Sequence, residues 1–202
     1  MEAAKTERSE LTQGAIVDMA LEMAALDGLE SLSIGEIAKR LNLSKSGVFS
    51  RIGSREALQR AVLEEFDRRF QQDILVPALR EPRGLPRLDA IMRAWLGRAT
   101  LPGSRGACLY AAGSFEFDDR DDSPLRELLL AGVRRWRGAL RRSVLQAVEA
   151  GHLRADLDAD QLVFELDGLF TALMREARFL RDPQTAERGW AWYRRLIDSY
   201  RG

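Results

Sequence analysis

The sequence predicts an all-α protein in which a small N-terminal domain of three helices precedes a larger helical domain. In nearly every segment between turn residues, apolar side chains recur at the three- and four-residue spacing of an amphipathic helix. The chain has 202 residues, of which 46% are apolar, so it can form the cores of one small and one larger module. We place the boundary after residue 53, which gives domains of residues 1–53 and 54–202.

The N-terminal domain begins with a helix and continues as a helix-turn-helix. Apolar residues at helical spacing predict the first helix from about residue 9 to residue 26, and Asp27-Gly28 ends it. The segment SIGEIAKRLNLSKSGVFSRIGSR, residues 33–55, then contains two short amphipathic helices on a three-residue turn. Such a pair forms a helix-turn-helix, whose second helix can enter the major groove of DNA.

Capping residues mark the ends of these two short helices. Ser33 is expected to cap the first helix, with Glu36 completing a capping box. Asn42 tolerates the left-handed conformation that a tight exit from a helix requires. Ser44 is expected to cap the second helix, which is barely two turns long.

The local charge changes sign across the helix-turn-helix. Residues 1–38 hold two basic and eight acidic side chains, whereas residues 39–60 hold six basic side chains and one acidic one. Although the formal net charge of the whole chain is zero, cations clustered on one surface are what phosphate contact needs. A second run of arginines, between Arg134 and Arg142, is interpreted as the solvated face of a helix rather than as another nucleic-acid surface.

Helices are also expected through the rest of the chain. Each is marked by a stripe of apolar residues and by turn residues at its ends. One begins after Ser54 and runs toward Pro77, and another begins at the pair Ser123-Pro124. The others are expected at about residues 88–100, within the apolar segment 107–117, at 161–180 and at 190–200.

The last two helices suggest contact with a second copy of the chain. The helix at residues 161–180 is apolar nearly all round, so it should be buried on both sides. The last helix carries large side chains on one stripe: Trp190, Tyr193, Leu196, Ile197 and Tyr200. We expect these two helices, about residues 160–200, to pair with those of a second subunit in a four-helix bundle. Packing of the same stripe inside one chain is the alternative that the pattern leaves open.

Composition argues against several other classes of protein. No stretch is long and apolar enough for a membrane helix, and MEAAKTERSE lacks the apolar core of a signal peptide, so we expect a cytoplasmic protein. Cys108 is the only cysteine and His152 the only histidine, which leaves disulfides, cysteine zinc sites and Cys-His or Ser-His catalysis without support. We therefore expect no enzyme activity, no cofactor and no metal.

The first sixty residues resemble the TetR-type one-component transcriptional regulators. The resemblance rests on Ile37-Ala38, the turn, the run SKSGVFSRI at residues 44–52, and SREAL at residues 54–58. The family pattern there is loosely S-K-x-x-L-Y-x-x-F followed by S-K-E-x-L. It implies an all-helical homodimer with an N-terminal DNA-binding domain and a divergent C-terminal domain that binds a small molecule and dimerises.

The resemblance and the helix geometry together assign the residues expected to contact a palindromic operator in double-stranded DNA. Side chains at positions 45, 46, 49 and 50 share one face of the second short helix. Phe49 replaces the usual tyrosine, so it has no hydroxyl for a phosphate. The expected contact set is Lys45, Ser46, Phe49 and Ser50 near the bases, Lys39, Arg51 and Arg55 at phosphates, and Ser44 and Gly47 at the start of the helix.

A small-molecule effector is expected in the C-terminal domain, where its binding would change the separation of the two recognition helices. The candidate pocket residues are the aromatic side chains and the thiol of the middle segments: Trp95, Cys108, Phe115, Trp136 and Phe170. We expect a repressor released by this molecule. A helical enzyme or adaptor whose helix-turn-helix does not read DNA is the alternative.

Overall fold

A computed structural model describes residues 2–100 and 108–202, and these residues form helices with no strand among them. This confirms the all-α prediction. The chain folds into two compact units, the first made of residues 1–68 and 106–130 and the second of residues 69–105 and 131–202. The domain boundary after residue 53 stays a prediction.

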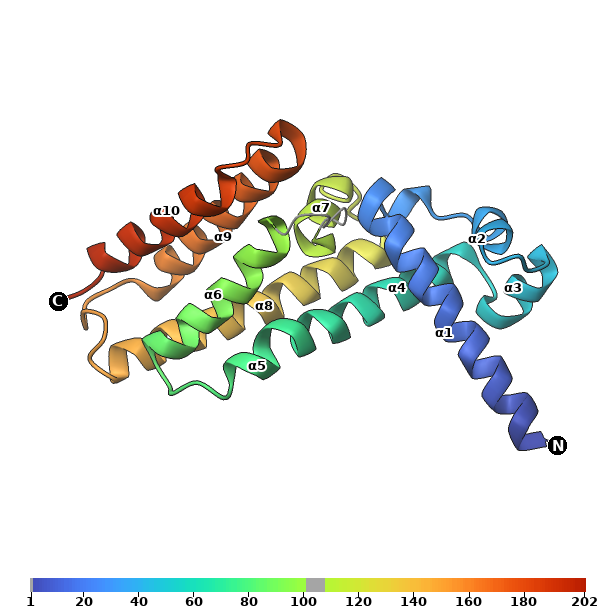
Figure 1. Ribbon diagram of the computed structural model, residues 1–202, viewed down its shortest axis with the longest axis horizontal. Coiled ribbons are helices and arrows are strands. Elements are labelled where there is room, and N and C mark those ends of the chain that lie inside the picture. The colour runs from blue at the N-terminus through green and yellow to red at the C-terminus, as the bar shows by residue number, and fades with distance from the viewer. Residues whose placement is uncertain (1, 101–107) are drawn as a thin grey trace. The chain divides into compact units, whose positions relative to one another are not determined.

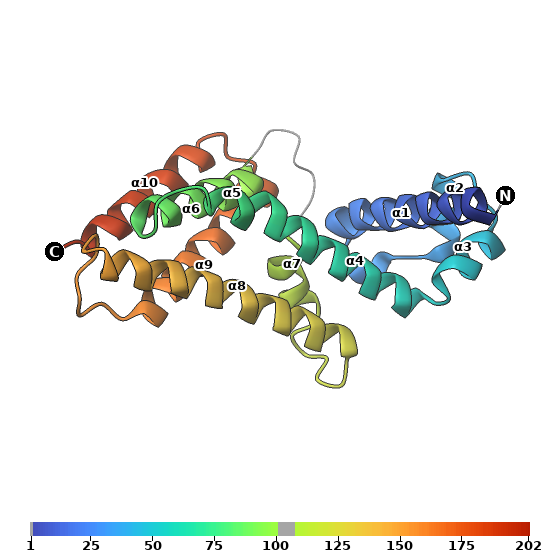
Figure 2. The ribbon, with the colours of Figure 1, turned by 90° about the horizontal axis from the view of Figure 1, so that it is seen from below.

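The first unit contains the helix-turn-helix and a segment from the middle of the chain (Figures 1 and 2). Its helices surround a core in which Ile16, Ile37 and Val48 are fully buried. The elements are α1 (Glu2–Asp27), the 3₁₀ turn η1 (Leu29–Ser31), α2 (Ile34–Arg40), α3 (Lys45–Ile52), the start of α4 (Arg55–Phe70), α7 (Leu109–Glu116) and the start of α8 (Pro124–Glu149).

Most of the predicted caps are present around the helix-turn-helix. Asn42 has a φ of 53° in the turn. The hydroxyl of Ser44 accepts a hydrogen bond from the amide of Gly47 at 3.0 Å, and that of Ser54 accepts one from the amide of Ala57 at 3.0 Å. These bonds satisfy amides that the first turn of a helix leaves without partners.

The predicted capping box is wrong. Ser33 occupies the N-cap position of α2, but its side chain makes no capping hydrogen bond. Glu36 instead pairs with Arg40 one turn later, at 3.2 Å. An i, i+4 ion pair on an exposed helix competes for the same carboxylate that a capping box needs.

The second unit is a helical bundle built around α6 (Figures 1 and 2). After α4 the chain continues through a π-helical turn, and a second π-helical turn follows α9, so both runs remain helical. The elements are η2 (Gln71–Leu75), α5 (Val76–Ala78), α6 (Leu85–Thr100), the rest of α8, α9 (Ala159–Arg175), η3 (Glu176–Leu180) and α10 (Thr185–Ser199).

The large stripe of α10 packs inside this unit. Tyr193, Ile197 and Tyr200 are 1%, 3% and 8% exposed. The hydroxyl of Tyr193 donates to Asp89 of α6 at 2.6 Å, and burial together with this carboxylate raises the pKa of Tyr193. For these three side chains, packing inside one chain is therefore the alternative that the structure shows. Their apolar spacing reflects burial against α6 and α9 of the same chain.

His152 has a structural partner in the second unit. Its Nδ1 accepts a hydrogen bond from the amide of Leu85 at 3.1 Å, at the first residue of α6. The side chain thus acts as a cap for α6, which requires Nδ1 to be unprotonated.

Candidate DNA-binding surface and effector site

Helix α3 presents one polar face to solvent and buries the other. Val48 is fully buried, whereas the side chains on the opposite side are exposed: Lys45, Ser46, Phe49 and Ser50. Phe49 is 55% exposed although it is a large aromatic residue on a short, capped helix. The predicted division of α3 into a buried and an exposed face is therefore present. On the exposed face, the ring of Phe49 lies beside the small polar side chains of Ser46 and Ser50.

Two predicted cations are available on this part of the surface. Lys39 on α2 and Lys45 on α3 are exposed, and neither side-chain ammonium group has a hydrogen-bond or ion-pair partner in the part of the chain that the structure describes. Arg51 bends back along α3, so that its Nη1 donates to the carbonyl of Gly47 at 2.8 Å. An ammonium group without a protein partner can neutralise a phosphate with no bond to break first.

Gly47 has a local structural reason to be glycine. A Cβ at this position would lie 2.9 Å from the hydroxyl oxygen of Ser44, the atom that caps α3. Any larger residue would have to displace the cap, so the cost of glycine in a helix is offset by an intact first turn.

Arg55 is engaged with the backbone that leads into the helix-turn-helix. Its Nε donates to the carbonyl of Leu32 at 2.9 Å, and its Nη2 donates to the carbonyl of Glu30. The same group lies 3.4 Å from the carboxylate of Glu30. Arg55 therefore ties the start of α4 to the segment before α2, and its contact with a phosphate stays a prediction.

A carboxylate from the middle of the chain holds the other end of that segment. The two oxygens of Glu116, the last residue of α7, accept hydrogen bonds from the amides of Leu29 and Glu30 at 3.0 and 2.7 Å. Gly28 permits this approach, because it has a φ of 90° and a Cβ there would lie 2.8 Å from Glu116. We call this arrangement the Glu116 clamp. Nothing in the local sequence pattern identified it.

A small charge network supports the clamp. Glu30 pairs with Arg120 at 3.1 Å as well as with Arg55. Burial alone would raise the pKa of Glu30, but hydrogen bonds and charges from Arg120 and Arg55 outweigh it and lower the pKa below its ordinary value. The Glu30 carboxylate therefore remains ionised and pairs with Arg55 of α4 and with Arg120, which follows α7.

Three of the predicted effector residues lie in contact in the second unit. Trp95 of α6 stacks on Phe170 of α9 with ring centroids 4.2 Å apart, and Trp136 of α8 meets Trp95 edge to face at 4.7 Å. Phe70 then packs edge to face against Trp136 at 4.8 Å. We call these four residues the aromatic cluster.

The other two predicted effector residues belong to the first unit. Cys108 precedes α7 at its N-cap position and is partly exposed. Phe115 is 67% exposed on α7, because the buried residues of that helix are Leu109, Tyr110 and Gly113. Phe115 thus does not share the buried environment of the aromatic cluster.

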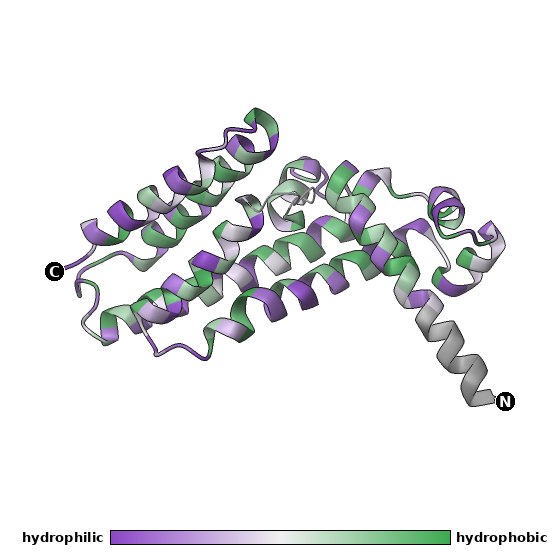
Figure 3. Cartoon of the chain, viewed as in Figure 1, coloured by the Kyte–Doolittle hydropathy of each residue, from purple (hydrophilic) through white to green (hydrophobic). Residues whose placement is uncertain are grey.

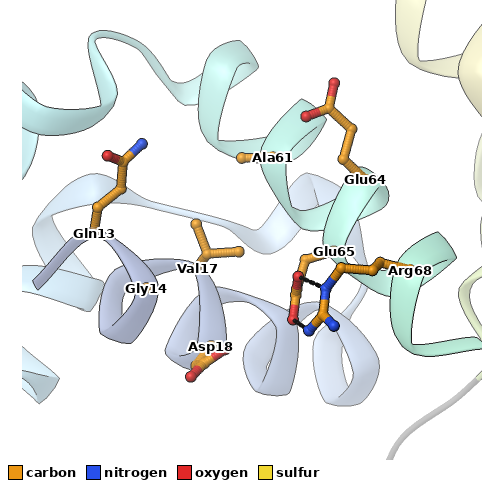
Figure 4. A pocket seen from close by; sticks show the side chains of 8 residues that line it. All are labelled: Gln13, Gly14, Val17, Asp18, Ala61, Glu64, Glu65 and Arg68. Atoms are coloured by element: carbon orange, nitrogen blue, oxygen red, sulfur yellow. Dashed lines mark hydrogen bonds and ion pairs between the residues drawn. The ribbon is translucent and has the colours of Figure 1, made fainter. Parts of the chain in front are cut away.

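An open hollow of about 420 Å³ lies between α1 and α4 in the first unit (Figure 4). Charged and apolar residues both line it, and Arg68 pairs with Glu65 there at 2.5 and 2.8 Å. None of the predicted site residues lines this hollow.

Apolar side chains are exposed on α9 and α10. Phe164 is 62% exposed and Trp192 is 41% exposed. Gly168, one turn beyond Phe164, has open space where a Cβ would be. In Figure 3, hydrophobic residues continue along most of α9. We call the exposed surface of these two helices at Phe164, Gly168 and Trp192 the outer α9–α10 face.

Two further findings concern classes of site. No helix among the described residues is long and apolar enough to cross a membrane. Within the same residues, no three His, Cys, Asp or Glu side chains gather in an arrangement that holds a metal ion.

Two protein families match the sequence. Residues 16–62 match the family described as bacterial regulatory proteins, tetR family. Residues 84–193, more than half of the chain, match the family described as tetracyclin repressor-like, C-terminal domain. No curated protein matches the sequence significantly.

Solved structures share the fold. A TetR transcriptional regulator from Chloroflexus aurantiacus is 22% identical, with 95% of each chain covered and a TM-score of 0.83. A TetR-family regulator from Agrobacterium tumefaciens is 15% identical, with 96% of this chain and all of that chain covered, also at 0.83. AibR, solved in complex with isovaleryl coenzyme A and operator DNA, is 21% identical over 81% of this chain and 85% of its own, at 0.67.

Proposed function

We propose a specific role for this chain, which belongs to the TetR family of bacterial transcriptional regulators: a dimeric repressor that a small molecule releases from a palindromic operator. The family consists of DNA-binding transcription factors that are not enzymes, so the predictions of DNA binding and of no enzyme activity are confirmed. Repression, release, dimerisation and a cytoplasmic location are our proposals.

The exposed face of α3 carries the proposal. Lys45 and Phe49 project from a helix whose opposite side is buried at Val48 and whose first turn is capped by Ser44. We propose that Phe49 contacts a thymine methyl or a sugar in the major groove, with Ser46 and Ser50 beside it. Because few of these side chains make bidentate bonds to bases, DNA shape supplies part of the specificity.

Phosphate contacts are assigned to the cations around α3. The side chains of Lys39 and Lys45 are free to bind phosphate, and Arg51 on α3 and Arg55 at the start of α4 are the other two candidates. For Arg55 we propose that its main role is to fix the entry to α2, and that any phosphate contact uses the exposed part of its guanidinium. Its side chain is 47% exposed.

The proposed role is tested by gel shift with DNA flanking the gene that encodes this chain. Lys45→Glu should weaken binding at least tenfold and reduce the salt dependence, because a counterion-releasing contact is lost. Arg142→Glu, an exposed change on α8, is the matched control and should leave binding unchanged. No binding by the wild type would favour the adaptor, and equal losses in both variants would show that α3 is not the reading helix.

Release by an effector is supported by the place of α7 in the chain. The C-terminal family match covers residues 84–193 and therefore includes residues 106–130, which fold in the first unit with the DNA-binding helices. The Glu116 clamp joins this segment to η1, just before α2. A change of conformation in the C-terminal part of the chain thus has a defined contact through which it reaches the helix-turn-helix.

The effector itself is proposed to bind at the aromatic cluster. Trp95, Trp136 and Phe170 come from three different helices, as expected for a site between the helices of a bundle. Roles for Cys108 and Phe115 in effector binding stay predictions.

Dimerisation is proposed through the outer α9–α10 face. Phe164 and Trp192 expose large apolar side chains, and Gly168 allows close approach of another helix. Two such faces would form a four-helix contact about a two-fold axis, as the family resemblance implies.

A further inference from the structure

Three buried donor atoms in the second unit have no hydrogen-bond partner among the described residues: Nε1 of Trp95, Nε1 of Trp136 and Nη1 of Arg178. The two indoles are 3% and 4% exposed. A buried donor without a partner destabilises the folded state, and more so when the group is charged. Three such donors in one small bundle point to acceptors that a bound molecule supplies.

The π-helical turn η3 turns Arg178 toward the side of the helix that carries Phe170. Arg178 follows Phe170 by eight residues, which in an unbroken α-helix would rotate it about 80° away. The wider π turn rotates each residue less, so Arg178 returns close to the direction of Phe170. Phe170 stacks on Trp95 of α6, and η3 also packs on α6.

The acid nearest to Arg178 in the sequence is already paired. Glu176, on the same turn, lies 3.3 Å from Arg175. Arg175 is exposed, with 72% of its side chain accessible, whereas Nη1 of Arg178 is buried. The two arginines therefore differ in their partners. Arg175 is paired with a carboxylate, whereas Arg178 has a buried donor atom without an acceptor.

A second π-helical turn borders the same cluster. Phe70, which packs on Trp136, immediately precedes η2, and η2 packs on α6. Such turns are rare and often occur at functional sites, because they widen a helix locally. One wide turn thus follows directly on a residue of the aromatic cluster, and both η2 and η3 pack on α6, the helix that carries Trp95.

We infer that the effector is an anion with a flat apolar body. This inference rests on the proposed function, in which the second unit binds an effector. The anionic group accepts from Arg178, acceptor atoms of the body receive the indole N–H groups of Trp95 and Trp136, and the body lies against the aromatic rings. A neutral ligand would leave the buried guanidinium donor unpaired.

A pair of probes that differ in charge tests the inference without DNA. 8-Anilinonaphthalene-1-sulfonate is the anion, and N-phenyl-1-naphthylamine has the same aromatic body without the sulfonate. The wild type should bind the anion at least tenfold more tightly, measured by probe fluorescence. Arg178→Met should reduce the affinity for the anion to that for the neutral probe, and Arg178→Lys should restore part of it.

Arg175→Met is the matched control and should bind both probes like the wild type. Equal affinity of the wild type for the two probes, no binding of the anion, or unchanged binding by Arg178→Met would overturn the inference. Without probe, Arg178→Met should melt at the same or a higher temperature, because it removes an unpaired buried donor. A large fall in melting temperature would mean that Arg178 is a structural residue. Since DNA is absent, these outcomes are independent of the operator test.

Discussion

Replacing Glu116 with alanine should lower the free energy of unfolding by about 2 kcal/mol and weaken operator binding roughly tenfold. The change removes both acceptors of the Leu29 and Glu30 amides, which lie partly buried just before α2. Without the clamp, the segment that orients the helix-turn-helix samples more conformations, and the binding-competent one becomes less populated. Urea unfolding and gel-shift titration measure the two effects.

Glu127→Ala is the matched control for the clamp. Glu127 is exposed at the start of α8 in the same unit, so its loss should change the free energy of unfolding by no more than about 0.5 kcal/mol and leave DNA binding unchanged. Glu116→Gln should give an intermediate result, since an amide retains only one acceptor oxygen. If Glu116→Ala behaves like Glu127→Ala, the clamp neither stabilises the first unit nor affects the helix-turn-helix.

Replacing Phe164 with glutamate should raise the dissociation constant of the dimer at least a hundredfold. The change would place a charge at the centre of the outer α9–α10 face, where the proposed contact excludes water. Phe164 is 62% exposed in the single chain, so folding of the monomer should be preserved. Analytical ultracentrifugation over a range of concentrations measures the shift from dimer to monomer.

Phe115→Glu controls for the chemistry of this substitution, because Phe115 is also a largely exposed phenylalanine, at 67%. It should leave the association constant unchanged. Phe164→Glu should also lose operator affinity, because a monomer binds only one half-site. A wild type that is monomeric at every concentration, or a Phe164→Glu variant that dimerises normally, would remove the outer face as the interface.

The helix-turn-helix was predictable because its signals are local. Asn42 at the turn and the caps of Ser44 and Ser54 each act within a few residues of their own position. Ser33 shows the limit of such signals, since Glu36 had two local partners available and paired with Arg40. The first helix begins at Glu2 rather than near residue 9, because most of the residues between these two positions are good helix formers.

The contacts that join distant segments were not predictable. Glu116 lies 87 residues from Leu29, and a glutamate at the end of an apolar segment has no spacing that identifies its partner. An apolar stripe on α10 likewise indicates burial but does not say which surface buries it, which is why the sequence left open whether Tyr193 packs inside the chain or against a second subunit. Trp95, Trp136 and Phe170 lie in contact because large aromatic residues at core positions of neighbouring helices often meet, whereas their role in binding an effector stays a prediction.

The most direct test of the central claim is methylation protection of guanine N7 on bound operator DNA, which reports the major groove. A dimer that inserts two α3 helices should protect two half-sites whose centres lie about 34 Å apart, or a multiple of this, on one face of the duplex. Lys45→Glu should lose both protected segments together, and Arg142→Glu should keep them. Protection of a single segment, or binding with no major-groove protection, would contradict a two-fold regulator that reads DNA with α3.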